Sequence, residues 1–96
     1  MTSVLNLIGN TPLAQINYLN TNPNVQTYGK LEGQNPGGSV KDRAAYGMIK
    51  GALDRGDVQK GSILVEATSG NTGIALAMIA RQFGLEMTLV MPESAS

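Results

Sequence analysis

The chain has 96 residues, enough for one compact domain at most, and its seven basic residues balance its seven acidic residues. A chain with no net charge carries no electrostatic footprint for nucleic acid or for an anionic membrane surface. Because cysteine and histidine are both absent, the sequence excludes disulfides, thiolate or imidazole metal sites and Ser-His-Asp hydrolysis for this chain.

The first third of the chain is predicted to be extended. Two runs of mixed polarity, LAQINYL and VQTYGKLE, are separated by NTNPN, which is dense in turn-forming residues. This pattern favours an antiparallel pair of strands, followed by a loop at EGQNPGG. The start, MTSVLNLIGNTP, does not read as a secretory signal, and no apolar run reaches the length of a membrane span. We therefore expect a soluble, cytoplasmic protein with no membrane partner.

A helix is predicted from Val40 to Arg55. Apolar residues recur there at helical spacing, at Val40, Ala44, Ala45, Met48, Ile49, Ala52 and Leu53. Ser39 is the expected N-cap, and Asp42 follows three residues later, as in a capping box. Gly56 is the expected stop.

A strand–helix–strand unit is predicted next, so the fold class is α/β. SILVEA is typical of a strand buried on both faces. Nearly every residue from Ile74 to Phe83 is apolar, which predicts a largely buried helix closed by Gly84. EMTLVM is the next strand, ended by Pro92. This order predicts a parallel sheet, and because two strands cannot cover both faces, we interpret the chain as the front part of a larger α/β protein.

The loop TSGNTG lies between this strand and this helix, where parallel sheets gather their ligands. Free amides and the helix dipole there favour an anion, so we predict a site for a carboxylate or a phosphate. The loop also offers side-chain donors and glycines that let a ligand approach closely, namely Thr68, Ser69, Asn71, Thr72, Gly70 and Gly73. The same residue types cap ordinary strand-to-helix turns, and the loop alone leaves that alternative open.

The stretch NPGGSVKDR places Lys41 at the start of a helix. A P-loop is excluded because Ser39 stands where lysine is required, and TSGNTG lacks the first Gly-x-Gly of a dinucleotide fingerprint. The positive potential of a helix start, with Arg43 two residues away, favours the neutral amine that Schiff-base chemistry requires. Residue types alone favour the alternative of a solvated surface lysine.

Four blocks together carry a resemblance to a known family: IGNTPL, KLEGQNPGGSVKDRAA, EATSGNTGIALA and LVMPES. The chain resembles the pyridoxal-phosphate enzymes of fold type II, and within them the B-type cysteine synthases. Cystathionine β-synthases share much of the sequence of these blocks. The resemblance implies that residues 1–34 pack on a larger domain and that residues 35–96 begin a smaller α/β domain. The family's phosphate-binding loop and its partner for the pyridine nitrogen are expected beyond residue 96.

The resemblance also implies residue roles. Lys41 matches the Schiff-base lysine, which also shuttles the substrate Cα proton, and Asn71 matches the asparagine that hydrogen-bonds the cofactor's phenolic oxygen. The loop that holds the substrate α-carboxylate is matched by Thr68, Ser69, Gly70 and Thr72. No residue matches a metal site.

The function that the resemblance implies is that of a pyridoxal-phosphate cysteine synthase. Such an enzyme makes L-cysteine from O-acetyl-L-serine and sulfide by β-replacement, here as a homodimer with no nucleic-acid partner. The alternatives are a non-catalytic truncated module, a cystathionine β-synthase-like enzyme or a threonine dehydratase-like enzyme.

Overall fold

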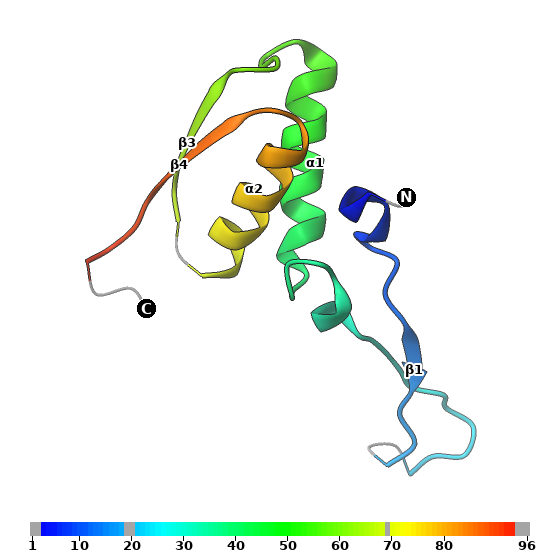
Figure 1. The fold of residues 1–96 in the computed structure, drawn as a ribbon. Helices are drawn as coiled ribbons and strands as arrows, with labels where there is room; N and C mark the ends of the chain where they lie inside the picture. The colour runs from blue at the N-terminus through cyan, green and yellow to red at the C-terminus, as the bar shows by residue number, and fades with distance from the viewer. Residues whose placement is uncertain (1–2, 19–20, 69, 94–96) are drawn as a thin grey trace.

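The computed structural model describes residues 3–18, 21–68 and 70–93, which form an α/β unit and an N-terminal hairpin that projects from it (Figure 1). The elements follow in the order η1 (Val4–Leu7), β1 (Leu13–Gln15), β2 (Tyr28–Lys30), η2 (Glu32–Gln34), α1 (Lys41–Arg55), β3 (Ile63–Ala67), α2 (Asn71–Gln82) and β4 (Glu86–Val90). Neither α-helix among the described residues is long and apolar enough to cross a bilayer.

The predicted antiparallel pair is confirmed, although each strand has only three residues. Leu13 pairs with Lys30 and Gln15 pairs with Tyr28. One further backbone hydrogen bond, from Ile16 N–H to the Thr27 carbonyl at 2.8 Å, extends the ladder toward the turn. Because the side chains of Leu13 and Tyr28 are exposed, the hairpin contributes little to the core.

Helix α1 is confirmed, and its end follows the predicted chemistry. Gly56 adopts the left-handed conformation with φ of 81°, and its N–H donates to the carbonyls of Ala52 and Leu53. Ser39 Oγ accepts a hydrogen bond from the Lys41 N–H at 3.1 Å. The helix begins at Lys41 with Val40 as its N-cap, so the predicted start at Val40 and the predicted N-cap Ser39 are each one residue too early. The capping box is also wrong, because the Asp42 carboxylate does not return to Ser39 but accepts from the Gly37 N–H at 2.6 Å.

The predicted parallel pair is also confirmed. Strands β3 and β4 run in the same direction, with Ile63 opposite Glu86 and Ala67 opposite Val90, and α2 connects them. Helix α2 begins three residues before the predicted start, at Asn71, and the left-handed Gly84 lies just beyond its end, with φ of 71°.

The hydrophobic core lies between the two helices and one face of the β3–β4 pair. Its buried members are Ala45, Ile49, Ala75, Leu76, Ile79, Ala80 and Leu85. Leu64 and Met87 pack against this core from the strands, whereas Ile63 and Val65 are 64% and 65% exposed. The expectation that β3 is buried on both faces is therefore not met within this chain, because both helices cover the same face.

The expectation of a largely buried helix after TSGNTG is met on one side of α2. Ala75 and Ile79 of α2 are fully buried, whereas Ile74 on the other side is 54% exposed. The rings of Tyr46 and Phe83, with centroids 6.3 Å apart, add a contact between the α1 and α2 regions. The buried side of α2 thus faces α1 and the strands.

Candidate functional site

The carboxyl ends of β3 and β4 and the amino ends of α1 and α2 lie at the same edge of the α/β unit (Figure 1). This follows from the topology, since β3 and β4 are parallel, α2 returns between them, and α1 packs along α2. Lys41 is the first residue of α1 and Asn71 is the first residue of α2. The two positions that the sequence singled out, 30 residues apart along the chain, therefore share one edge.

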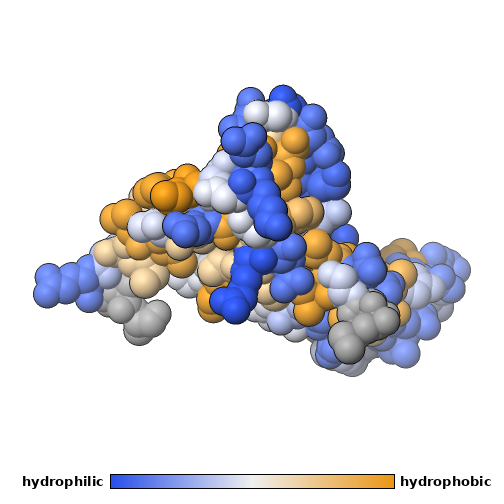
Figure 2. Space-filling model, turned by 45° about the horizontal axis from the view of Figure 1, so that its top comes forward, coloured by the Kyte–Doolittle hydropathy of each residue, from blue (hydrophilic) through white to orange (hydrophobic). Residues whose placement is uncertain are grey.

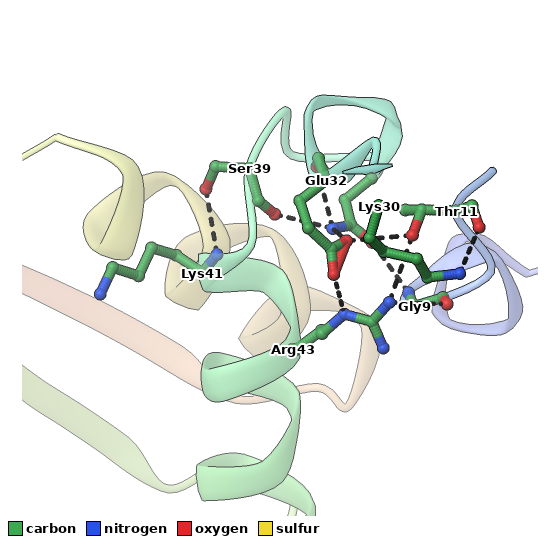
Figure 3. Close-up of polar contacts among 8 residues, drawn as sticks. Gly9, Thr11, Lys30, Glu32, Ser39, Lys41 and Arg43 are labelled. Atoms are coloured by element: carbon green, nitrogen blue, oxygen red, sulfur yellow. Dashed lines mark hydrogen bonds and ion pairs between the residues drawn. The ribbon is translucent and has the colours of Figure 1, made fainter. Parts of the chain in front are cut away.

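The side chain of Lys41 is exposed at this edge. Figure 3 shows it extending away from the polar cluster around Arg43. Within the described residues its Nζ atom has no hydrogen-bond or ion-pair partner, whereas Lys30 Nζ donates to the Thr11 carbonyl and Lys50 Nζ pairs with Asp54 at 2.6 Å. The Lys41 amine is therefore accessible to a ligand at this edge.

Arg43 anchors the first turn of α1 to the N-terminal segment. Its Nε atom donates to the Glu32 carboxylate, and Nη2 donates to the Gly9 carbonyl at 2.9 Å and to Thr11 Oγ1 at 3.2 Å (Figure 3). Thr11 Oγ1 in turn donates to Glu32 at 3.1 Å. The hydrogen bond from Arg43 holds the pKa of Glu32 below its ordinary value of 4.5, with smaller contributions from Thr11 and Asn35.

Asn35 connects the same segment to the loop that precedes Lys41. The residue is only 4% exposed, and its Oδ1 accepts from the Gly9 N–H at 2.8 Å. Its Nδ2 donates to the carbonyls of Glu32 at 3.0 Å and Ser39 at 2.9 Å. We call Gly9, Thr11, Glu32, Asn35 and Arg43 the Arg43 network. It fixes the loop and the start of α1 to a segment far away in sequence.

The loop before α2 is shaped by two glycines with different tasks. Gly70 has φ of 64°, which favours glycine, and its carbonyl accepts from the Ile74 N–H at 3.2 Å. Gly73 is buried, and a Cβ there would lie 3.2 Å from Leu89 Cδ1 and 3.4 Å from Thr68 Cγ2. Gly73 therefore lets α2 pack closely on β4. The approach of a ligand at Gly73 stays a prediction.

The amino end of α2 has the features of an anion site. The Ile74 N–H closes the first intrahelical hydrogen bond, so the amides of residues 71–73 have no partner within the helix. Asn71 is exposed and Thr72 is half-buried, while Ser69 lies outside the described residues. Next to this helix start, a depression of about 500 Å³ is lined by Ala67, Thr68, Val90, Met91 and Pro92.

The sequence analysis did not identify most of the Arg43 network, and it gave Arg43 only the role of a nearby positive charge. A signal was present, because the only apolar side chain in the loop sequence from Glu32 to Ser39 is that of Pro36, which is too little to fix the loop by packing. Such a loop needs side-chain hydrogen bonds, and Glu32 and Asn35 are its candidates.

Comparison with known proteins agrees with this arrangement. The model of the family described as "Pyridoxal-phosphate dependent enzyme" matches residues 4–96. Cysteine synthase B of Salmonella typhimurium is 52% identical over all 96 residues, and an O-acetylserine dependent cystathionine beta-synthase of Bacillus subtilis is 47% identical over 93 residues. The chain covers 32% and 30% of these two proteins, about a third of their length.

The solved structures confirm the predicted fold class. The crystal structure of a hydrogen sulfide-producing enzyme from Fusobacterium nucleatum superposes with a TM-score of 0.86 at 48% identity, over the whole of this chain and 32% of that one. The fold is thus that of the first third of a larger α/β enzyme. Since the family model covers nearly every residue, the chain belongs to the pyridoxal-phosphate dependent enzymes.

Proposed function

We propose that the full-length protein is a β-replacement enzyme that makes L-cysteine from O-acetyl-L-serine and sulfide with pyridoxal phosphate. The observation that carries the proposal is the Lys41 amine, which has no partner among the described residues and lies at the same edge as the amino end of α2. The 52% identity to a cysteine synthase B supports the choice of reaction.

The residues at this edge fit pyridoxal phosphate. The cofactor needs a primary amine to attach its aldehyde, and the Lys41 Nζ atom is accessible and free of ion pairs within the described chain. The exposed amide of Asn71, at the start of α2, would hydrogen-bond the phenolic oxygen. The contacts to the cofactor phosphate are expected from residues beyond position 96.

In this proposal each side chain has a defined task. Bound pyridoxal phosphate supplies an electron sink for the negative charge that develops at the substrate Cα. Lys41 would take the Cα proton and return it to Cα after sulfur has bonded to Cβ. The substrate carboxylate binds at the amino end of α2, where free amides and the helix dipole favour an anion, through Thr68, Ser69, Gly70 and Thr72. Acetate leaves Cβ, and the sulfur of sulfide takes its place.

A second candidate shares this site and differs in the nucleophile. The 47% identity to an O-acetylserine dependent cystathionine beta-synthase favours homocysteine in place of sulfide. Assays of the full-length protein with O-acetyl-L-serine and either sulfide or homocysteine, with mass detection of the product, separate the two. Formation of product with homocysteine but not with sulfide would contradict the cysteine synthase proposal.

The proposal extends to the assembly of the full-length protein. We propose a cytoplasmic homodimer in which residues 1–34 pack on a larger domain and residues 35–96 begin a smaller one. The four sequence blocks that resemble the family support this arrangement. Sedimentation of the full-length protein would test it, and a monomeric mass would contradict it.

The identity of the cofactor-bearing lysine is the direct test of the site. Borohydride reduction of the holoprotein, followed by peptide mapping, should place the pyridoxyl group on Lys41, and Lys41→Ala should abolish the visible absorption of the bound cofactor. Lys50→Ala is the matched control, since Lys50 lies on the same helix and is paired with Asp54. A label on Lys30, Lys50 or Lys60 would contradict the assignment.

A further inference from the structure

The turn that precedes Lys41 is closed by the side chain of the next residue. Asp42 is 1% exposed, although it lies in the first turn of α1. Its Oδ2 atom accepts from the Gly37 N–H at 2.6 Å, so the carboxylate reaches back across the backbone of Lys41 to the start of the Gly37–Gly38 turn. Within that turn the Gly38 N–H donates to the Asn35 carbonyl at 2.8 Å.

Gly37 makes room for this carboxylate. A Cβ at Gly37 would lie 3.0 Å from Asp42 Cγ and only 2.2 Å from Asp42 Oδ1, and the second distance is shorter than Cβ contacts in real structures, so the carboxylate would have to move. The φ of Gly37 is not positive, so its conformation does not by itself demand glycine. The absence of a side chain at Gly37 is therefore explained by the Asp42 carboxylate that occupies the space.

One oxygen of Asp42 makes the contact and the other does not. Among the residues that the structure describes, Asp42 Oδ1 is buried without a hydrogen-bond partner. The contact with Gly37 therefore needs one acceptor and no second oxygen. An asparagine could supply that acceptor with the same shape, whereas an alanine could not.

We infer that Asp42 is a positioning residue that sets the place of Lys41 at the site edge. Lys41 lies inside a ring of hydrogen bonds: its own N–H donates to Ser39 Oγ at 3.1 Å, the Asp42 N–H donates to the Ser39 carbonyl at 3.4 Å, and the Asp42 carboxylate holds Gly37. This inference rests on the proposed function, in which Lys41 carries the cofactor. Asp42 acts through the backbone and has no contact with the reacting groups.

The test measures how fast the cofactor-free full-length protein captures pyridoxal phosphate at Lys41. Asp42→Ala should slow capture by about tenfold, the factor expected for the loss of one hydrogen bond of ordinary strength. Asp42→Asn should restore most of the rate. Asp54→Asn is the matched control, because Asp54 is an exposed aspartate of the same helix, and it should behave as wild type. Borohydride trapping with peptide mapping identifies the lysine that has bound the cofactor. The visible absorption band and its pH dependence report the environment of that lysine.

Gly37→Ala provides a second route to the same contact. The added methyl group takes the place of the Asp42 carboxylate, so this variant should capture pyridoxal phosphate as slowly as Asp42→Ala does. Gly33→Ala is its control, since a Cβ at Gly33 would meet only the Gly38 carbonyl at 3.9 Å. If Asp42→Ala does not fold, Asp42→Asn and Gly37→Ala still decide the question.

The outcomes separate this inference from the proposed function. A folded Asp42→Ala or Gly37→Ala variant that captures the cofactor at the wild-type rate with an unchanged band overturns the positioning role. A folded Asp42→Asn variant as slow as Asp42→Ala overturns the hydrogen-bond account. If the pyridoxyl group in the wild-type protein maps to a lysine other than Lys41, the proposed function is overturned instead.

Discussion

Lys41 and Arg43 stand two residues apart on α1 and have opposite surroundings. Two residues correspond to roughly 200° around a helix, so the side chains leave α1 in different directions. The guanidinium of Arg43 is bound by Glu32, Gly9 and Thr11, whereas the Lys41 Nζ atom has no partner among the described residues. One basic side chain therefore fixes the helix, and the other is left accessible at the site edge.

The Arg43–Glu32 contact predicts a pH dependence. The pKa of Glu32 is lowered in the folded protein, chiefly by the hydrogen bond from Arg43. The charged form therefore stabilises the fold above the ordinary glutamate pKa of 4.5, and this contribution is lost as pH falls through the lowered value. We expect wild type to be more stable than Glu32→Gln at pH 6, with the difference vanishing in acid, as measured by urea unfolding of the full-length protein across pH. Glu86→Gln is the control, because Glu86 is exposed and forms no ion pair among the described residues. A difference that persists unchanged in acid would contradict the expectation.

The amino end of α2 predicts a selective loss of substrate binding. Thr72→Ala removes a hydroxyl from the proposed carboxylate site, and loss of a hydrogen bond to a charged group costs about 1.5–3 kcal/mol. A spectral titration of the holoprotein with amino-acid substrate should therefore show weaker binding with a nearly unchanged cofactor spectrum, and the same is expected for Ser69→Ala. Thr88→Ala, an exposed threonine on β4, should bind as wild type does. If Thr72→Ala and Ser69→Ala both bind the amino-acid substrate with wild-type affinity, the proposed role of this loop in binding the substrate carboxylate is wrong.

At the scale of the elements, the sequence predicted both α-helices and all four strands because their signals are local. It missed the two short 3-10 helices, η1 in the segment predicted to be extended and η2 in the predicted loop. The helical spacing in α1, the glycine after Arg55 and the apolar run of β3 each lie within one element. The capping box failed because the Gly37 N–H, presented by a tight turn, binds the carboxylate that the local rule assigns to Ser39. The burial of β3 was overestimated because its composition reflects both faces, whereas this chain covers only one.

The site was predictable only in part for the same reason. Lys41 and the loop from Thr68 to Thr72 lie at helix starts, and helix starts can be found in a sequence. The Arg43 network joins residues up to 34 positions apart, and no local pattern reports such contacts. The close packing of Gly73 against Leu89 was missed because Leu89 belongs to β4, outside the loop and helix that the local pattern covers.

Two glycines, one within α1 and one directly after its end, predict opposite effects of the same substitution. Gly47 is exposed, and a Cβ there would meet nothing within 4 Å, so Gly47→Ala should stabilise the protein by about 0.5–1 kcal/mol. Gly56 has φ of 81°, so Gly56→Ala should destabilise it by about 1–2 kcal/mol. Denaturant unfolding of both variants of the full-length protein provides the measurement. A destabilised Gly47→Ala would mean that another part of the protein covers this face of α1.

At the scale of the whole molecule, the chain is elongated and unevenly covered. It extends over 54 × 36 × 25 Å, and the hairpin projects from the α/β unit (Figure 1). Figure 2 shows hydrophobic surface on the side formed by the strand pair, while the hairpin end is mostly hydrophilic. The exposed apolar side chains of the strand pair and the residue after it include Ile63, Val65, Val90 and Met91, each more than half exposed. Such a surface needs a cover.

This surface predicts the behaviour of the 96-residue chain in isolation. We expect the isolated chain to be marginally stable or to associate, because the β3–β4 pair leaves one apolar face open. It should also bind pyridoxal phosphate weakly, since the contacts expected for the phosphate lie elsewhere. Sedimentation and a cofactor titration of the purified chain measure both properties. A monomer that melts cooperatively and binds the cofactor tightly at one site would contradict this view of the fold.

The two attachments of the Lys41 region differ in the chain entropy that they require. The Asp42–Gly37 contact closes a separation of five residues, and the Arg43–Gly9 contact closes one of 34. By the scaling of loop closure with length, the longer closure costs about 1.7 kcal/mol more. The turn around Lys41 is therefore inexpensive to form by itself. Its attachment to the N-terminal segment depends on the combined strength of the hydrogen bonds in the Arg43 network, which must form together to offset the longer closure.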